Sequence, residues 1–141
     1  MNNFLSFITS LNEAYNRKMD QAGEECGLTR AEINVLVFLA NNPELNNAKD
    51  IVKYRSMAKS HVNQALDSLQ NKGYVKVEAS VSDHRFKKIV LLEKSQEAVH
   101  GGRKAQKGFL SGLKKIFTPE EEKEWERLND KIYKEIMKNA D

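Results

Sequence analysis

The residues best suited to binding chemistry lie between positions 53 and 64. This stretch carries three basic side chains, Lys53, Arg55 and Lys59, and no Asp or Glu. The polar side chains among them are Ser56, Ser60, His61, Asn63 and Gln64. Positive charge beside hydrogen-bonding groups, with no acid to repel a phosphate, favours recognition of a nucleic acid. The solvent-facing side of an ordinary amphipathic helix has a similar composition, so the stretch alone leaves both interpretations open.

One helix over residues 56–71 can present these side chains together. Apolar residues recur there at the three- and four-residue steps of one helix side, at Val62, Ala65, Leu66 and Leu69. That side is expected to be buried and the polar side to face outward. Ser56 is a suitable N-cap. A shorter helix over residues 48–54 precedes it, and two short helices joined by a tight turn predict a helix-turn-helix.

A β-hairpin is predicted directly after this helix. Gly73 occupies the place of a glycine that ends a helix, and residues 74–78 then alternate in the manner of a strand. A second strand covers residues 87–92, and the loop between the strands brings Arg85 close to Lys87. An arginine on a hairpin tip has the shape and charge to enter a DNA minor groove. The helix-turn-helix and this hairpin, which we call the wing, predict a winged helix over about residues 28–92.

Two helices are predicted ahead of residue 48. The first covers residues 3 to about 22, and its apolar side carries Phe4, Ile8, Leu11, Tyr15 and Met19. Gly23 and Gly27 are expected to loosen the chain after it. Thr29 and Glu32 have the spacing of a capping box, which predicts the start of a second helix that runs to about residue 40.

Two more helices are predicted over residues 93–139. The first contains four glycines and, between residues 101 and 115, five bases and no acid. Because glycine weakens a helix, we expect a bend or a frayed region near Gly101 and Gly102. The basic side chains form either a solvated surface, which is the favoured interpretation, or a secondary phosphate contact. The second begins at Thr118, with Pro119 in the first turn and Glu121 closing a capping box. Its apolar stripe consists of Trp125, Leu128, Ile132 and Ile136, flanked by Tyr133 and Met137.

The first and last helices each present an apolar side that needs a partner. The economical solution is that the terminal helices, over about 3–22 and 93–139, pack together and against the same elements of a second chain. This arrangement predicts a homodimer. Residues 118–141 hold eight acids and five bases, a net charge of −3, which leaves +6 on residues 1–117. Contact with DNA is therefore expected from the earlier part of the chain.

Length and composition fit one domain over residues 1–141. No apolar run approaches the twenty residues of a membrane span and no secretory signal begins the chain, so a cytoplasmic location without membrane contact is predicted. Cys26 is the single cysteine and cannot form an internal disulfide. A redox role for it stays open, although the neighbouring Glu24 and Glu25 disfavour the thiolate.

No pattern in the sequence predicts an enzyme. A nucleophile paired with a base, a paired-carboxylate site and a phosphate-binding loop are all missing. His61, His84 and His100 are scattered without metal-ligand spacing, although Glu97 with His100 leaves a regulatory metal site open. We therefore expect neither catalysis nor a cofactor.

Three segments resemble the multiple-antibiotic-resistance regulator (MarR) family. They are Leu28-Thr29-Arg30-Ala31-Glu32, the run 59–69 with Lys72-Gly73-Tyr74-Val75, and Asp83-His84-Arg85 ahead of Ile89-Val90-Leu91-Leu92. The resemblance spans nearly the whole chain, and the Asp-x-Arg wing is its most specific part. It implies a mainly α (α+β) fold, a winged helix-turn-helix with N- and C-terminal dimerisation helices. Members of the family are dimeric transcription factors, usually repressors, whose DNA affinity falls when a small ligand, often aromatic, or an oxidant acts near the dimerisation helices.

The resemblance also implies roles for single residues. Lys59, Ser60, His61, Asn63 and Gln64 match positions that face the major groove, Arg85 matches the wing arginine, and Asp83 matches an acid that braces the wing. The full set of expected DNA contacts is Arg55, Ser56, Lys59, Ser60, His61, Asn63, Gln64, Arg85 and Lys87.

The chain departs from the family pattern at two points. Leu92 and Ser95 stand where the family commonly has the threonine and glycine of Leu-Thr-Glu-Lys-Gly, so the threonine that would cap the fifth helix is lost. Gln64 stands where many relatives carry arginine, which indicates a different base preference, since glutamine can read adenine.

The predicted function is a DNA-binding transcriptional regulator. We expect a ligand- or stress-responsive repressor that binds a pseudo-palindromic operator as a homodimer, with double-stranded DNA and a small-molecule effector as candidate partners. The alternative is a protein-binding winged-helix adaptor without specific DNA binding. Salt distinguishes the two, because the affinity of a DNA binder for duplex falls steeply as salt rises.

Overall fold

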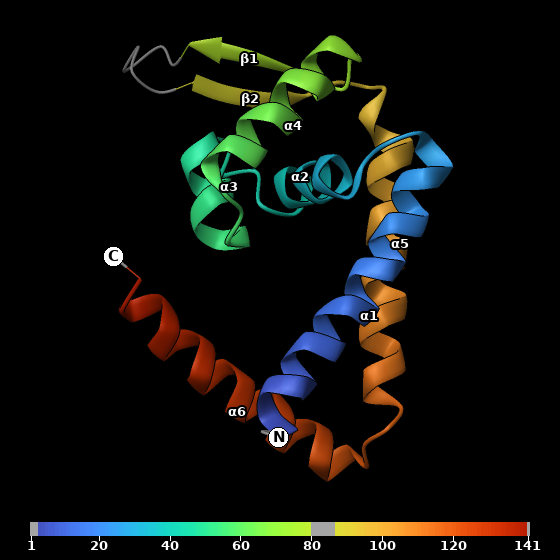
Figure 1. Cartoon of the computed structure of the whole chain (residues 1–141), viewed down its shortest axis with the longest axis vertical. Coiled ribbons are helices and arrows are strands. Elements are labelled where there is room, and N and C mark those ends of the chain that lie inside the picture. The colour runs from blue at the N-terminus through green and yellow to red at the C-terminus, as the bar shows by residue number, and fades with distance from the viewer. Residues whose placement is uncertain (1–2, 80–86, 141) are drawn as a thin grey trace. The chain divides into compact units, whose positions relative to one another are not determined.

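The structure, a computed structural model, describes residues 3–79 and 87–140 (Figure 1). Its elements are α1 (Asn3–Cys26), α2 (Arg30–Asn41), α3 (Ala48–Arg55), α4 (Lys59–Asn71), β1 (Val75–Ala79), β2 (Lys87–Leu91), α5 (Ser95–Lys114) and α6 (Pro119–Lys138). This order confirms the winged helix-turn-helix between terminal helices that the sequence predicts. The chain divides into two compact units, residues 1–106 and 107–141. Within the described ranges, no helix combines the length and apolar character that a membrane crossing requires.

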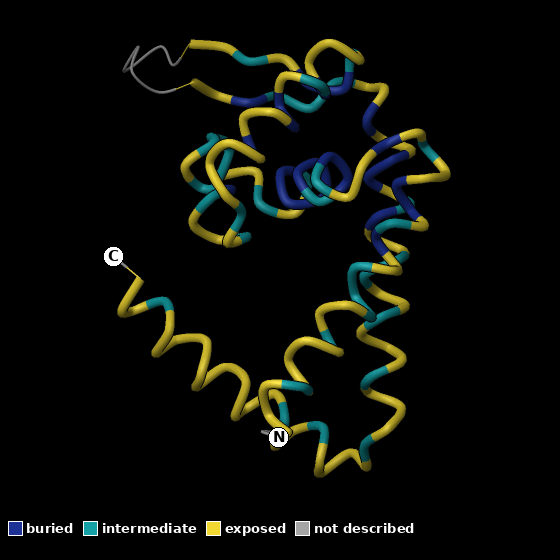
Figure 2. Tube along the Cα trace, in the orientation of Figure 1, coloured by how far each residue is buried: buried dark blue, intermediate teal, exposed yellow. Residues whose placement is uncertain are grey.

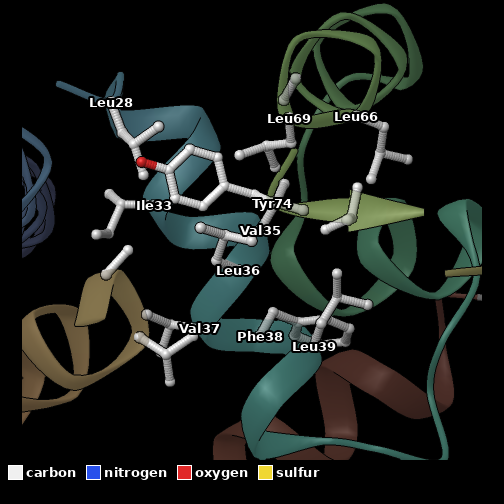
Figure 3. Close-up of a cluster of buried hydrophobic side chains, with 14 of the residues drawn as sticks. Leu28, Ile33, Val35, Leu36, Val37, Phe38, Leu39, Leu66, Leu69 and Tyr74 are labelled. Carbon is white, nitrogen blue, oxygen red and sulfur yellow. The ribbon is translucent and has the colours of Figure 1, made fainter. Parts of the chain in front are cut away.

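Helix α2 is the centre of the first unit. Residues 35–39 are all buried, and Figure 2 shows burial concentrated on α2 and on the parts of other elements that face it. The elements α1, α3, α4 and β2 all contact α2. A helix covered from so many directions must be apolar around most of its circumference, which explains its unbroken run of apolar residues. Figure 3 shows these side chains together with Leu66, Leu69 and Tyr74, which come from α4 and the segment just after it.

Helix α2 begins at the capping box predicted from the sequence. The backbone N–H of Glu32 donates to Oγ1 of Thr29 over 3.2 Å, and the N–H of Thr29 donates to Oε1 of Glu32 over 2.9 Å. Two N–H groups without a helical acceptor are satisfied in this way. Glu32 is only 2% exposed, and its carboxylate also contacts Ser68 of α4.

Helix α4 begins three residues later than predicted. Ser56 is not its N-cap: it ends α3 in a left-handed conformation (φ 51°, ψ 38°), and Ala58 precedes α4 without a side-chain cap. The prediction failed because an N-cap requires an extended backbone at Ser56, whereas the chain uses that residue to turn. The tight turn allows Ile51 of α3 and Val62 of α4 both to enter the core.

Helix α4 ends at Asn71, and Gly73 just beyond it terminates the helix as predicted. Gly73 has a φ of +82°, a conformation that costs glycine little. Its N–H donates to the carbonyl of Gln70, and the N–H of Tyr74 donates to the carbonyl of Leu69. This pair of bonds is a Schellman motif, and it delivers the chain directly into β1.

Strands β1 and β2 form an antiparallel pair with Val77 opposite Ile89. The N–H of Ile89 also donates to the carbonyl of Asn46 over 2.8 Å, so the extended segment after α2 joins the hairpin. Ile89 and Val75 are buried, which anchors the hairpin on the core. The loop that carries Asp83, His84 and Arg85 lies outside the described residues.

Two glycines expected to interrupt helices lie within them instead. Helix α1 extends to Cys26 rather than ending near residue 22, and a Cβ on Gly23 would come within 2.6 Å of the carbonyl oxygen of Leu28. Helix α5 is continuous from Ser95, and a Cβ on Gly102 would lie 2.3 Å from Cγ2 of Val37. The frayed region expected near Gly102 is therefore not present, because α5 is uninterrupted there. Glycine permits α5 to approach the buried side of α2.

The second unit contains the end of α5 and all of α6. Thr118 and Glu121 form the predicted capping box, with Pro119 as the first helical residue. The rings of Phe117 and Trp125 lie 5.4 Å apart between centroids. Four large apolar side chains of α6 are 43–60% exposed: Leu128, Ile132, Tyr133 and Ile136.

Candidate nucleic-acid interface

Helix α4 separates a polar side from an apolar side, as its sequence predicts. Its apolar residues Val62, Ala65, Leu66 and Leu69 are all buried. The polar residues assigned to recognition are all exposed: Lys59, Ser60, His61, Asn63 and Gln64. The buried residues fix the rotation of α4 about its own axis. The structure therefore holds these five side chains on one accessible surface, which we call the α4 face.

The start of α4 is suited to an anion. No side chain caps it, and no acid occurs in its first turn. The first N–H groups of a helix have no acceptor within the helix, and the helix dipole places partial positive charge there. Lys59 adds a full positive charge at the same end. A phosphate at this position can accept hydrogen bonds from backbone and side chain together.

An ion pair between the buried Glu32 and the exposed Lys72 joins α2 to the end of α4. Oε2 of Glu32 accepts a hydrogen bond from Oγ of Ser68 over 2.8 Å and lies 3.0 Å from Nζ of Lys72. Burial raises the pKa of Glu32, but the hydrogen bonds from Thr29, Ser68 and Lys72 outweigh burial and hold that pKa below its ordinary value. Every carboxylate oxygen is satisfied, so the charge is stabilised where it lies. Glu32 thus fixes the position of α4 relative to α2.

In the sequence, Glu32 is recognisable only as part of a cap. Its partners Ser68 and Lys72 are separated by four residues on α4, a spacing that brings side chains together on one side of a helix. That spacing was the available signal, although it does not indicate which acid lies opposite. Lys94 adds a further link: its Nζ donates to the carbonyl of Lys72 over 2.7 Å and lies 4.8 Å from the centre of the Tyr74 ring.

Arg55 is turned toward the interior of the first unit. Its Nη2 donates to the hydroxyl of Tyr15 over 3.2 Å and to Oδ1 of Asn34 over 3.5 Å. The guanidinium carbon lies 5.9 Å from the centre of the Tyr15 ring. Ser56 is exposed in the turn that follows, and Lys87 is exposed at the start of β2. The structure thus brings Arg55 and Ser56 next to the start of α4 and places Lys87 on the hairpin.

Cys26 lies at the end of α1 and is half-buried. Burial raises the pKa of its thiol, and the nearby carboxylates of Glu97 and Glu25 raise it further. A raised pKa lowers the fraction of reactive thiolate at neutral pH. In the described part of the chain, no three His, Cys, Asp or Glu side chains are grouped so that they could hold a metal ion.

Comparisons with known proteins agree with this geometry. Residues 27–85, which run from the capping box of α2 into the wing, match the family model of the MarR family. No curated protein matches the chain in sequence.

Solved structures resemble the chain over nearly its whole length. A MarR transcriptional regulator from Methanosarcina mazei Go1 has a TM-score of 0.82 at 17% identity, covering 98% of this chain and 99% of the other. A proposed MarR family transcriptional regulator from Listeria monocytogenes, complexed with a 26mer DNA, has a TM-score of 0.86 at 16% identity, with 99% and 93% covered. MepR of S. aureus, in complex with DNA, has a TM-score of 0.77 at 19% identity, with 96% and 98% covered. The TM-scores establish a shared fold, and at identities this low the similarity shows the fold alone.

Proposed function

We propose that this chain is a MarR-family transcriptional regulator that binds double-stranded DNA sequence-specifically as a homodimer, since residues 27–85 match the model of that family. The observation that carries this proposal is the α4 face, on which five polar or basic side chains are exposed while the opposite side of the helix is buried. The major groove admits one α-helix, and the start of a recognition helix is the part that meets base edges. The DNA in the complexes of the Listeria monocytogenes protein and of MepR supports the same use of the fold.

Each residue of the α4 face has a role in this proposal. Lys59 and the N-terminus of α4 bind a phosphate, which sets the position of the helix on the duplex. Asn63 and Gln64 read base edges, with adenine as the preferred partner because its N6 and N7 match a carboxamide. Ser60 and His61 lie beside them and add hydrogen bonds to bases or phosphates.

Residues beside the α4 face extend the proposed contact. Arg85 enters the minor groove with Asp83 bracing the wing, and Lys87 binds the backbone next to it. Ser56, exposed before α4, is close enough in the chain to bind the same phosphate as Lys59. A guanidinium has five N–H donors, and the contacts with Tyr15 and Asn34 use only Nη2 of Arg55. We assign another of its N–H groups to a phosphate.

The homodimer is proposed from the apolar side chains that the described helices expose. Ile132 and Ile136 of α6 are 52% and 60% exposed, and Phe7 and Ile8 of α1 are 52% and 46% exposed. Apolar side chains that recur along one helix side indicate an interface, because their burial is favourable by roughly 25 cal/mol per Å². A second copy presents the same surfaces, so a two-fold interface satisfies both chains. Such a dimer requires a pseudo-palindromic operator with half-sites about 10 bp apart.

The proposed mode of action is repression, as is usual in the family. Phenolic compounds and peroxide are the effectors to test, because small aromatic ligands and oxidants act on relatives. The raised pKa of Cys26 makes a small molecule the better candidate of the two, since oxidants react with the thiolate.

Sequencing the genomic DNA fragments that the purified protein retains tests the proposal. The expected result is a shared inverted-repeat motif, with an affinity that falls steeply between 50 and 200 mM salt in line with several phosphate contacts, at a slope of about 0.9 per phosphate. Repeating the retention with a phenolic ligand or peroxide tests the effector. A protein that retains no duplex at moderate salt is instead the adaptor considered above.

A further inference from the structure

The hydroxyl of Tyr15 is the meeting point of four helices of the first unit. It lies on α1 and accepts a hydrogen bond from Nε2 of Gln106, on α5, over 2.9 Å. It also accepts one from Nη2 of Arg55, on α3, over 3.2 Å. Its own proton is donated to Oδ1 of Asn34, on α2, over 3.3 Å. A tyrosine hydroxyl has one proton to donate and accepts at its oxygen, so these contacts use its hydrogen-bonding capacity fully.

The hydrogen bonds continue from this hydroxyl toward the end of α2. Oε1 of Gln106 accepts from Nδ2 of Asn41 over 3.5 Å, and Oδ1 of Asn41 accepts from Nε of Arg103 over 2.8 Å. Helix α5 is therefore tied to α2 at Asn41 and, through Tyr15, at Asn34. These links join α1 and α5 to α2 and α3, two helices that contact α4.

Arg55 connects this network to the turn that directs α4. It is the last residue of α3, and Ser56 directly after it adopts the left-handed conformation that turns the chain. The phenol of Tyr15 holds Arg55 both by the hydroxyl and by its ring, whose centre is 5.9 Å from the guanidinium carbon. A side chain on α1 thus holds Arg55, the residue directly before the turn that leads into α4.

We propose that Tyr15 is a positioning residue for DNA recognition: its hydroxyl fixes the orientation of the helix-turn-helix relative to α1 and α5 and so determines which half-site spacing the dimer accepts. The inference rests on the proposed function. Each added base pair moves a half-site by about 3.4 Å and rotates it by about 35°. A dimer whose recognition helices are held rigidly tolerates little of this displacement. A dimer without the Tyr15 hydroxyl adapts to it.

The variant that isolates the hydroxyl is Tyr15→Phe, because it keeps the ring beneath Arg55. The matched control is Tyr54→Phe, which removes a hydroxyl from an exposed tyrosine of α3. Affinities are measured at fixed salt on the operator obtained by fragment retention and on copies with one or two base pairs inserted or deleted between the half-sites. Wild type and the control should lose about tenfold or more for a two-base-pair change. Tyr15→Phe should lose less than about threefold while binding the native spacing within about fivefold of wild type, because the exposed side chains of α4 are unchanged.

If the affinity of Tyr15→Phe depends on half-site spacing as steeply as that of wild type, whatever its absolute affinity, the inference is overturned. The hydroxyl then has a purely structural role. If Tyr15→Phe fails to fold, Gln106→Met removes the hydrogen bond from α5 to the Tyr15 hydroxyl, together with the 3.5 Å contact to Asn41. This variant should likewise reduce the dependence of affinity on half-site spacing. An unchanged dependence of affinity on spacing in Gln106→Met overturns the inference equally. Failure of the wild type to bind any duplex contradicts the proposed function itself, which separates the two failures.

Discussion

Nζ of Lys72 lies 3.0 Å from Oε2 of Glu32, a carboxylate side chain that is only 3% exposed. Glu32 belongs to the first turn of α2 and Lys72 caps the end of α4. The same carboxylate caps its own helix through Thr29 and binds Ser68. A single acid therefore determines both where α2 begins and how α4 lies upon it, which connects the stability of the core to the presentation of the α4 face.

Replacing Glu32 by Gln should lower the free energy of unfolding by about 1–3 kcal/mol, because Thr29, Ser68 and Lys72 lose a charged acceptor that is itself buried. Urea unfolding at pH 7 measures the change. The matched control is Glu44→Gln, which alters an exposed carboxyl and should have an effect of less than about 0.5 kcal/mol. Equal stability of the two variants would contradict a structural role for the ion pair.

The contribution of Glu32 should depend on pH in a defined direction. Its pKa is lower in the folded state than its ordinary value, so the unfolded chain takes up a proton at a higher pH than the folded chain. The stabilisation is complete above the unfolded pKa of about 4.3 and is lost as the pH falls through the folded pKa. The difference in unfolding free energy between wild type and Glu32→Gln should shrink over that acidic window. A difference that is constant from pH 7 to pH 3 would exclude the carboxylate as its source.

Alanine at two adjacent glycines of α5 should have opposite effects. A Cβ at Gly101 meets nothing within 4 Å, whereas one at Gly102 meets Cγ2 of Val37 at 2.3 Å. Gly101→Ala should raise the melting temperature through helix propensity. Gly102→Ala should lower it, because Val37 is fully buried and stiff. The two variants should differ by about 2 kcal/mol in unfolding free energy. A stabilised Gly102→Ala would show that α5 does not need this close approach.

The sequence predicted the features that local rules determine. The capping boxes at Thr29 and Thr118 follow from residues three positions apart, and the burial of Val62 and Leu69 follows from helical period. Gly101 and Gly102 cannot be told apart in the sequence. They differ only in the fold, where α2 packs against Gly102 and not against Gly101. Ser56 was misassigned for a related reason: a serine suits both an N-cap and a polar turn, and the packing of α3 and α4 selects the turn.

The candidate site divides in the same way. The exposure of Lys59 and Gln64 was predictable from the polar side of one helix. The network around Tyr15 was not, because Gln106 lies 91 residues away in the chain and no spacing rule connects them. The sequence predicted Tyr15 to lie on the apolar side of the first helix, where its ring does pack against the core, and left its hydroxyl without a role.

Variants of the α4 face should separate base reading from phosphate binding. Gln64→Ala should relax base choice at one operator position, with a loss of about 1–3 kcal/mol on the preferred base and little elsewhere. Lys59→Ala should weaken all sequences similarly and reduce the salt slope by about 0.9. Arg85→Ala should likewise weaken binding to many sequences.

Binding selections on randomised operators and salt titrations measure these effects, with Lys138→Ala in α6 as the control for loss of one positive charge. Unchanged binding by both Gln64→Ala and Arg85→Ala would exclude the assignment of Gln64 to the major groove and of Arg85 to the minor groove.

A charge in the exposed stripe of α6 should dissociate the proposed dimer. Ile132 is 52% exposed in this chain, and its burial against a second copy is worth about 1.5–3 kcal/mol, which Glu forfeits while adding the cost of a buried charge. Ile132→Glu should therefore raise the dimer dissociation constant by about 100-fold or more. Lys123→Glu introduces the same side chain on the opposite side of α6 and should leave the dimer intact. Sedimentation equilibrium measures both, and a wild type that is monomeric at micromolar concentration, or an unaffected Ile132→Glu dimer, would exclude this stripe as the interface.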